Sequence, residues 1–229
     1  IILAPVHHYM LKGVSVYPEG AFKTPLGYLD VDSVFVRKLV AAGQSFSFQP
    51  GAFAKEHTLE TQLPFLQRVL KDFKIVPIMF GECSLQDCRM VADALAKAIA
   101  GRDDVLVVAS TDMYHGYDFI DAGIIDDRTL TFIQKMDAEG LYQGLQKGSL
   151  QLCGGYDVVT AILLAKALGY TSAEVLSHTT SAEVADTKKQ KTWTVGYGSA
   201  ALGLPSGAGA SFRGSAASQK REGAMIDKA

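Results

Sequence analysis

The chain has 229 residues, of which 48% are hydrophobic and 20% are charged, and its formal net charge at pH 7 is -2. This composition is typical of a globular domain and differs from that of a disordered chain. The small net charge and the absence of a basic run with interleaved aromatic residues argue against a nucleic-acid-binding surface. No apolar run approaches the roughly 20 residues that span a bilayer, so we expect neither nucleic acid nor membrane as a partner.

The three cysteines of the chain indicate its compartment. Cys83, Cys88 and Cys153 are odd in number and lack the spacing of a disulfide framework. A reducing compartment suits them better than a secreted fold, so we expect a cytoplasmic protein. We interpret Cys83 and Cys88 as ordinary reduced cysteines.

The predicted elements follow from apolar periodicity, which separates continuous or alternating strand patterns from helical ones. In chain order they are strand 1–3, helices 32–42 and 59–71, strand 74–79, helix 85–100, strand 105–109, helices 121–136, 139–147 and 157–168, and strands 173–177 and 192–201. The chain begins with Ile1 inside a strand pattern and without an initiator methionine. We therefore expect its natural N-terminus to lie upstream.

Several element boundaries carry a physical signature. Ser84 can accept hydrogen bonds from the first free amides of helix 85–100, and Gly101 can end that helix. Gly43 and Gly169 are placed to end two further helices in the same manner.

Helices that alternate with strands predict a single α/β domain with a mostly parallel central sheet and helices on both faces. In the last strand, large residues alternate with small ones, which indicates an antiparallel or edge position. After Leu204 the sequence becomes small and polar. We expect residues 1–204 to form the domain and residues 205–229 to form a flexible tail or linker.

Two polar clusters in the first third of the chain contain histidine. His7 and His8 follow a predicted strand end, where one can bind a metal, although both could be surface-loop residues. Glu56 and His57 lie just before a predicted helix whose first turn contains Glu60, and carboxylates near a helix N-terminus stabilise the helix through its dipole. A protonated His57 would not gain from that position, so we interpret it as a neutral imidazole that can act as a catalytic base or proton donor.

Two further clusters follow, one at the middle of the chain and one in its second half. After strand 105–109, Asp112 can orient a histidine ring, bind a metal or simply cap a turn, and His115 can be a catalytic or an ordinary loop residue. Cys153 precedes Gly154 and a predicted helix, and a helix N-terminus favours the thiolate form, which suits a ligand or a nucleophile. The alternative is a buried, inert cysteine. We interpret His178 as structural.

These clusters, in this order, resemble the Memo family, whose microbial members are called AmmeMemoRadiSam system protein B. The family pattern runs G-P-S-H-H, E-H-S-L-E-x-Q-L-P-F, S-S-D-x-x-H-Y/W-G and C-G. The chain has Ala4-Pro5-Val6-His7-His8, then Glu56-His57-Thr58-Leu59-Glu60-Thr61-Gln62-Leu63-Pro64-Phe65, then Ser110-Thr111-Asp112-Met113-Tyr114-His115-Gly116, and Cys153-Gly154. The likeness spans about residues 1–202, and its second segment is the most specific.

The resemblance implies a fold similar to that of class III extradiol dioxygenases, which use non-haem Fe(II). It also implies a metal site of two histidines and a cysteine. The first family histidine lies upstream of Ile1, the second corresponds to His7, and the cysteine corresponds to Cys153. Asp112 and His115 match residues that line the same pocket.

From the residues and the resemblance together, we expect a Memo-like metal-binding protein that could act as a redox enzyme and be linked to a radical-SAM system. Iron, Fe(II), is the first expectation for the metal, followed by copper and then zinc. A small-molecule substrate or O2 would bind at the metal, and radical-SAM system proteins are expected partners.

The alternatives are an extradiol-type ring-cleaving dioxygenase and a non-catalytic partner-binding protein or metallochaperone. The expected metal ligands are His7, Cys153 and Asp112, the catalytic residues are His57, His115 and Asp112, and the other pocket residues are His8, Glu56, Tyr114 and Gly154.

Overall fold

The computed structural model describes residues 1–41, 46–188 and 191–203. A five-stranded sheet lies at the centre of the N-terminal part, and three of its four strand pairings are parallel. Only the second and third strands in the sheet order run antiparallel to each other. The strand order is β5 (Phe46–Ser47), β2 (Val14–Val16), β6 (Pro77–Phe80), β1 (Ile2–Pro5) and β7 (Val108–Ala109).

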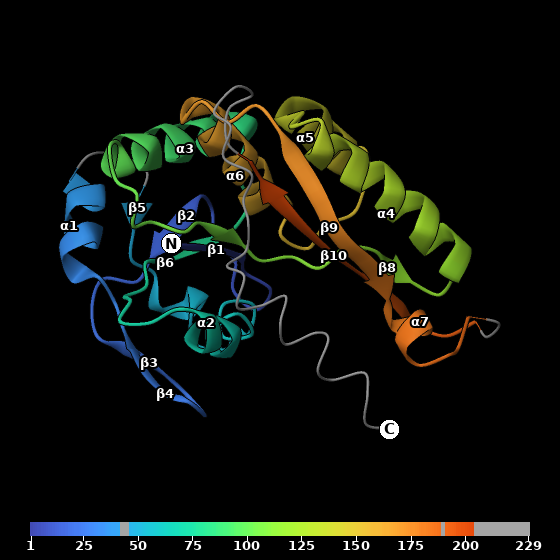
Figure 1. The fold of residues 1–229 in the computed structure, drawn as a ribbon, viewed down its shortest axis with the longest axis horizontal. Coiled ribbons are helices and arrows are strands. Elements are labelled where there is room, and N and C mark those ends of the chain that lie inside the picture. Colours follow the sequence, from blue (N-terminus) through green and yellow to red (C-terminus); the bar gives the residue numbers. More distant parts are fainter. Residues whose placement is uncertain (42–45, 189–190, 204–229) are drawn as a thin grey trace, which may run out of the picture.

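The two central strands, β1 and β6, are buried along their whole length. Their sequences are continuous in apolar character because helices cover both faces of the sheet, as expected for parallel strands. Figure 1 shows α3 and α6 on one side of this sheet and α2 on the other. The predicted fold class, an α/β domain with a mostly parallel central sheet, is therefore confirmed.

The predicted boundary of helix α3 (Leu85–Ile99) is confirmed in atomic detail. The Ser84 hydroxyl accepts a hydrogen bond from the Asp87 amide at 3.1 Å, and the Asp87 carboxylate accepts one from the Ser84 amide at 2.8 Å. Gly101 follows the helix with a φ of +73°. Helix α6 (Gly155–Ala167) packs against α3, and Gly169 follows it with a φ of +87°. Gly43 lies outside the described residues.

Other predicted elements are shorter than expected. Helix α2 covers only Leu63–Val69, because Pro64 belongs to the first turn and residues 58–62 form turns before it. Of the predicted strand 105–109, only β7 pairs with a neighbour. Helices α1 (Ser33–Ala41), α4 (Phe119–Gln134) and α5 (Ala138–Gln146) agree with their predictions, and the bend between α4 and α5 contains Met136 with a φ of +52°.

A second, antiparallel sheet was not predicted as a unit. It consists of β8 (His115–Gly116), β10 (Thr194–Leu202) and β9 (Ala173–Thr180), and α4 packs against it. The antiparallel prediction for the last strand is confirmed, but β10 lies between its two neighbours and not at an edge. The remaining elements are the β3 (Ala21–Thr24) and β4 (Gly27–Asp30) hairpin, a 3-10 turn at Pro50–Ala52 and α7 (Ser181–Val184).

Within the described residues, no helix has both the length and the apolar character that crossing a bilayer requires. The predicted tail, residues 205–229, lies outside the described residues.

Candidate metal centre

The parallel sheet brings the first three polar clusters to the carboxyl ends of β1 and β7. The Thr58 hydroxyl donates a hydrogen bond to the Pro5 carbonyl oxygen at 2.8 Å. The Ser110 hydroxyl donates to the Thr58 carbonyl oxygen at 2.8 Å and accepts from the Gln62 amide at 3.0 Å. Clusters that are about 50 residues apart in sequence are thereby joined, as expected at this edge of an α/β sheet.

The fourth cluster joins the third through two further hydrogen bonds. The Cys153 amide donates to the Asp112 carbonyl oxygen at 3.3 Å, and the Gly154 amide donates to the Thr111 hydroxyl at 2.9 Å. A β-carbon on Gly154 would lie 2.3 Å from the Ser110 carbonyl oxygen. The close approach of these two segments therefore requires glycine at position 154.

The Glu56 carboxylate lies next to the side chains of two of the predicted histidines. Glu56 Oε1 lies 3.2 Å from His7 Nδ1 and 3.3 Å from His57 Nδ1, and the two rings stack with centroids 5.6 Å apart. The ligand atoms of His7, Glu56 and His57 all lie within 4.8 Å of one another, a spacing that a metal ion could use. His8 belongs to the same group of rings, because its centroid lies 6.4 Å from that of His7.

Three backbone amides donate hydrogen bonds to the Glu56 carboxylate. It accepts hydrogen bonds from the amides of His7 at 2.5 Å, His57 at 2.9 Å and Thr58 at 3.3 Å, and its side chain is only 3% exposed. Burial alone would raise the pKa of Glu56, but the hydrogen bonds from these residues outweigh burial and lower it. Glu56 is therefore an anion that can fix the Nδ1 tautomer of both imidazoles and leave their Nε2 atoms free.

Asp112 and His115 form the predicted pair. Asp112 Oδ2 lies 3.3 Å from His115 Nε2, while His115 Nδ1 lies 3.0 Å from the Met113 carbonyl oxygen. The other carboxylate oxygen, Asp112 Oδ1, is buried and has no hydrogen-bond partner among the described residues. A buried oxygen without a donor is unusual and is suited to a cation.

Cys153 lies beside this carboxylate. Burial, and next the Asp112 carboxylate, raise the pKa of Cys153 above its usual range. The expectation that the helix N-terminus favours the thiolate is therefore wrong for the metal-free chain, because burial and a neighbouring negative charge outweigh the helix dipole. Cys83 and Cys88 are buried and unpaired, and burial raises their pKa values to about 12 and about 11, as expected for inert thiols.

Asp126 and His178 form a pair that the sequence did not reveal, and this pair contacts the third cluster at Tyr114. Asp126, on α4, is fully buried, accepts a hydrogen bond from the Tyr114 amide at 3.0 Å and lies 2.9 Å from His178 Nε2. This contact with a buried carboxylate agrees with the interpretation of His178 as a structural residue. Tyr114 itself is buried, at 6% exposure. An acid within an apolar helical run was the signal that could have indicated Asp126.

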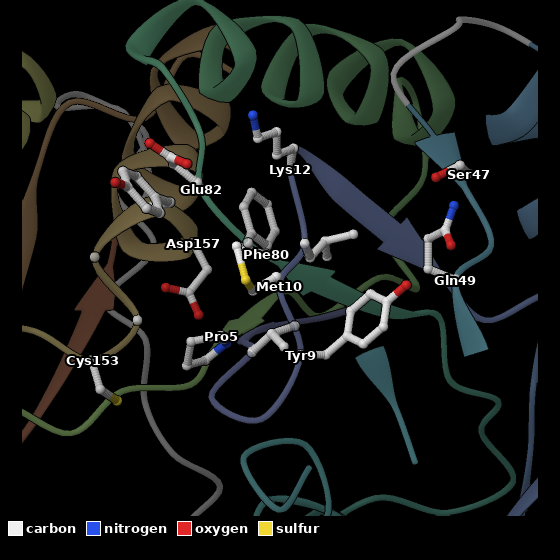
Figure 2. Close-up of a pocket in the computed structure, with 16 residues that line it drawn as sticks. Pro5, Tyr9, Met10, Lys12, Ser47, Gln49, Phe80, Glu82, Cys153 and Asp157 are labelled. Atoms are coloured by element: carbon white, nitrogen blue, oxygen red, sulfur yellow. The ribbon is translucent and has the colours of Figure 1, made fainter. Parts of the chain in front are cut away.

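A cavity of about 690 Å³ opens beside Cys153, and we call it the Cys153 cavity. Figure 2 shows Cys153 and Asp157 on one side of it, Ser47 and Gln49 on the other, and Tyr9, Met10 and Phe80 between. Of the predicted site residues, Cys153 and Gly154 line this cavity, whereas His7, His8, Glu56, His57, Asp112, Tyr114 and His115 are not among its lining residues. The cavity therefore shares the Cys153 side of the predicted site but is not lined by the histidine group.

Imidazole and carboxylate groups whose ligand atoms lie close together beside the carboxyl ends of parallel strands form a possible metal-binding group. The sequence profile described as Memo-like protein matches residues 1–201, so the chain belongs to the Memo family. A MEMO1 family protein of Saccharolobus solfataricus is 36% identical over 207 residues, which cover 89% of this chain and 71% of the relative. MEMO1 family proteins of Caldivirga maquilingensis and Pyrobaculum aerophilum are 31% and 34% identical, with 88% and 87% of this chain and 71% and 70% of those relatives covered.

Proposed function

We propose that this Memo family protein binds a redox-capable metal ion through His7, Cys153 and Asp112. The observation that carries the proposal is the buried Asp112 Oδ1, which accepts no hydrogen bond from a nitrogen or oxygen donor among the described residues and lies beside the Cys153 thiol. A cation would satisfy this oxygen and compensate the negative charge of a thiolate beside it. The donor set of imidazole, thiolate and carboxylate fits a borderline metal ion.

Each further residue has a role that follows from its contacts. Glu56 orients His7 by accepting from its Nδ1, so that Nε2 is free to act as the ligand atom. His57, which is 58% exposed on its side chain, and His115, which pairs with Asp112, can exchange protons with solvent and with a bound molecule. We assign proton transfer to these two histidines.

The metal, when bound, would supply Lewis acidity and, in the case of iron or copper, one-electron chemistry. Ligand softness suits iron, copper and zinc alike. The family resemblance makes Fe(II) our first proposal, copper the second and zinc the third. The substrate would be a small molecule or O2, and radical-SAM system proteins are proposed as partners. The unpaired cysteines support a cytoplasmic location.

A second candidate is an extradiol-type dioxygenase with a 2-His-1-carboxylate site. The close spacing of the His7, Glu56 and His57 ligand atoms favours it. Against it, the Glu56 carboxylate already accepts three backbone hydrogen bonds, which a metal ligand would have to share or give up. We therefore prefer Glu56 as the group that orients the histidines.

Cobalt binding distinguishes the two ligand sets. Co(II) is added to the metal-free chain without oxygen, and the sulfur-to-cobalt charge-transfer band and the affinity are measured. Our proposal predicts that the band is present in the wild type and in Glu56→Gln, and is lost in Cys153→Ala. The matched control is Cys88→Ala, which removes a buried thiol from elsewhere in the core. Loss of binding in Glu56→Gln together with full binding in Cys153→Ala would instead establish the 2-His-1-carboxylate set.

A further inference from the structure

The Cys153 cavity contains a buried acid that lacks a hydrogen-bond partner. Asp157, in the first turn of α6, is fully buried and lines the cavity. Its Oδ1 atom accepts a hydrogen bond from the Val158 amide at 2.9 Å, but Oδ2 has no partner among the described residues. Buried polar atoms nearly always have a partner, so this oxygen indicates a group that is supplied from outside the chain.

The protonation state of this acid determines what kind of group would face it. Burial raises the pKa of Asp157 well above its usual range and so favours the protonated, neutral form of the side chain. A neutral carboxylic acid carries one O–H donor. The complementary atom on a ligand is therefore a hydrogen-bond acceptor.

The middle of the cavity is apolar and aromatic. Tyr9, Met10, Phe80 and Tyr156 line it, and Figure 2 shows the ring of Tyr9 and that of Phe80 in its central part. Tyr9 packs against Gly51, where a β-carbon would lie 2.3 Å from the ring, so glycine lets this ring rest on the backbone. Such walls suit a flat apolar body, and the volume lies within the range of small-molecule sites.

One cationic and one anionic side chain are among the residues that line the cavity. Lys12 and Glu82 line it, and both are exposed. Their backbones form a parallel bridge, which directs paired side chains to the same side. Because the lining has one lysine and one glutamate, these two residues together give the cavity no excess charge that would favour an anion or a cation. A neutral ligand fits best.

We propose that the Cys153 cavity binds a small neutral aromatic carbonyl compound, whose ring contacts Tyr9 and Phe80 and whose carbonyl oxygen accepts a hydrogen bond from Asp157. Cys153 lies on the same side of the cavity as Asp157 (Figure 2). A bound compound would thus present its carbonyl end to the proposed metal centre. Binding of the compound requires no metal. Only the further step of regarding the compound as a substrate rests on the proposed function.

Four single-ring probes test the proposal on the full, metal-free chain: benzamide, benzoate, benzylammonium and toluene. Amide chemical shifts are followed by NMR during titration. For so small a fragment we expect benzamide to bind with a dissociation constant of about 1–10 mM and to shift the cavity residues Gly81 and Gly155. The other three probes should bind at least about fivefold more weakly.

Variants of Asp157 separate the hydrogen bond from the apolar contacts. Asp157→Asn keeps a donor, so benzamide binding should stay within about twofold. Asp157→Leu removes the donor and should weaken benzamide about tenfold while leaving toluene unchanged. Asp127→Leu, a change of an exposed acid on α4, is the control and should have no effect. Circular dichroism verifies that each variant is folded.

Several results would overturn the proposal. Tighter binding of benzoate or benzylammonium than of benzamide would contradict a neutral ligand, and equal binding of toluene would contradict the role of Asp157. Absence of binding by all four probes would remove the site. Because these titrations contain no metal, they can fail while the cobalt experiment succeeds, and the reverse is also possible.

Discussion

Gly196→Ala tests whether the buried Asp126 carboxylate is fixed as tightly as the structure indicates. A β-carbon at position 196 would lie 1.9 Å from Asp126 Oδ2 and 2.7 Å from its Cγ. The carboxylate would have to move by roughly 1 Å, which disrupts its hydrogen bonds with the Tyr114 amide and His178 Nε2. Hydrogen bonds to a charged group contribute about 1.5–3 kcal/mol each, so we expect the free energy of unfolding to fall by about 3–5 kcal/mol.

Urea unfolding at neutral pH with a chelator present, followed by circular dichroism, measures this loss. The matched control is Gly123→Ala, because Gly123 lies within α4 and a β-carbon there meets nothing within 4 Å. Alanine is the better helix former, so this variant should be more stable than the wild type by about 0.5–1 kcal/mol.

A double-mutant cycle assigns the effect to the contact itself. In an Asp126→Ala background the carboxylate is gone, so adding Gly196→Ala should destabilise the chain by only a small fraction of its effect in the wild type. A single Gly196→Ala variant within about 1 kcal/mol of the wild type would refute the reasoning, and so would an undiminished loss in the Asp126→Ala background.

Three further predictions concern the acid in the cavity, a helix cap and a site histidine. Burial raises the pKa of Asp157, so its contribution to stability is fully present below the unfolded pKa near pH 4 and falls as pH rises toward the folded pKa. Relative to Asp157→Asn, the wild type should lose about 1.4 kcal/mol per pH unit in that window, and parallel stability profiles would contradict this. Ser84→Ala should lower the free energy of unfolding by about 1 kcal/mol in urea titrations, since it removes the hydroxyl that accepts from the Asp87 amide while the backbone amide at position 84 still donates to Asp87; an unchanged midpoint would argue against the cap. His57→Ser should leave cobalt affinity within about twofold but change the pH dependence of any reaction at the centre, and loss of the metal would make His57 a ligand.

Elements with continuous or strongly periodic apolar patterns could be predicted from the sequence. The buried strands β1 and β6 have no polar face, and the α3 boundary is determined by local hydrogen bonds between Ser84 and Asp87. The shortening of α2 was also readable in principle, because Pro64 belongs in a first turn.

The second sheet and the Asp126 pair could not be predicted in the same way. Strand β8 has only two residues, and its pairing with β10 depends on tertiary contacts, including the buried contact of Asp126 with Gly196. Periodicity carries no information about partners so far apart in sequence.

The candidate site was predicted in part. Because parallel strands present their carboxyl ends at one edge, the meeting of the clusters around His7, His57 and Asp112 followed from topology. The charge state of Cys153 did not, because it depends on burial and on the nearby Asp112 carboxylate, which local sequence does not reveal.

The most direct test of the central claim is the metal content of the protein, measured by elemental analysis after purification without oxygen and with iron, copper and zinc supplied. The wild type and Cys88→Ala should each carry close to one equivalent of iron or copper, and Cys153→Ala should carry almost none. Equal metal content in Cys153→Ala and the wild type would contradict the proposed centre, and so would metal-free wild-type protein.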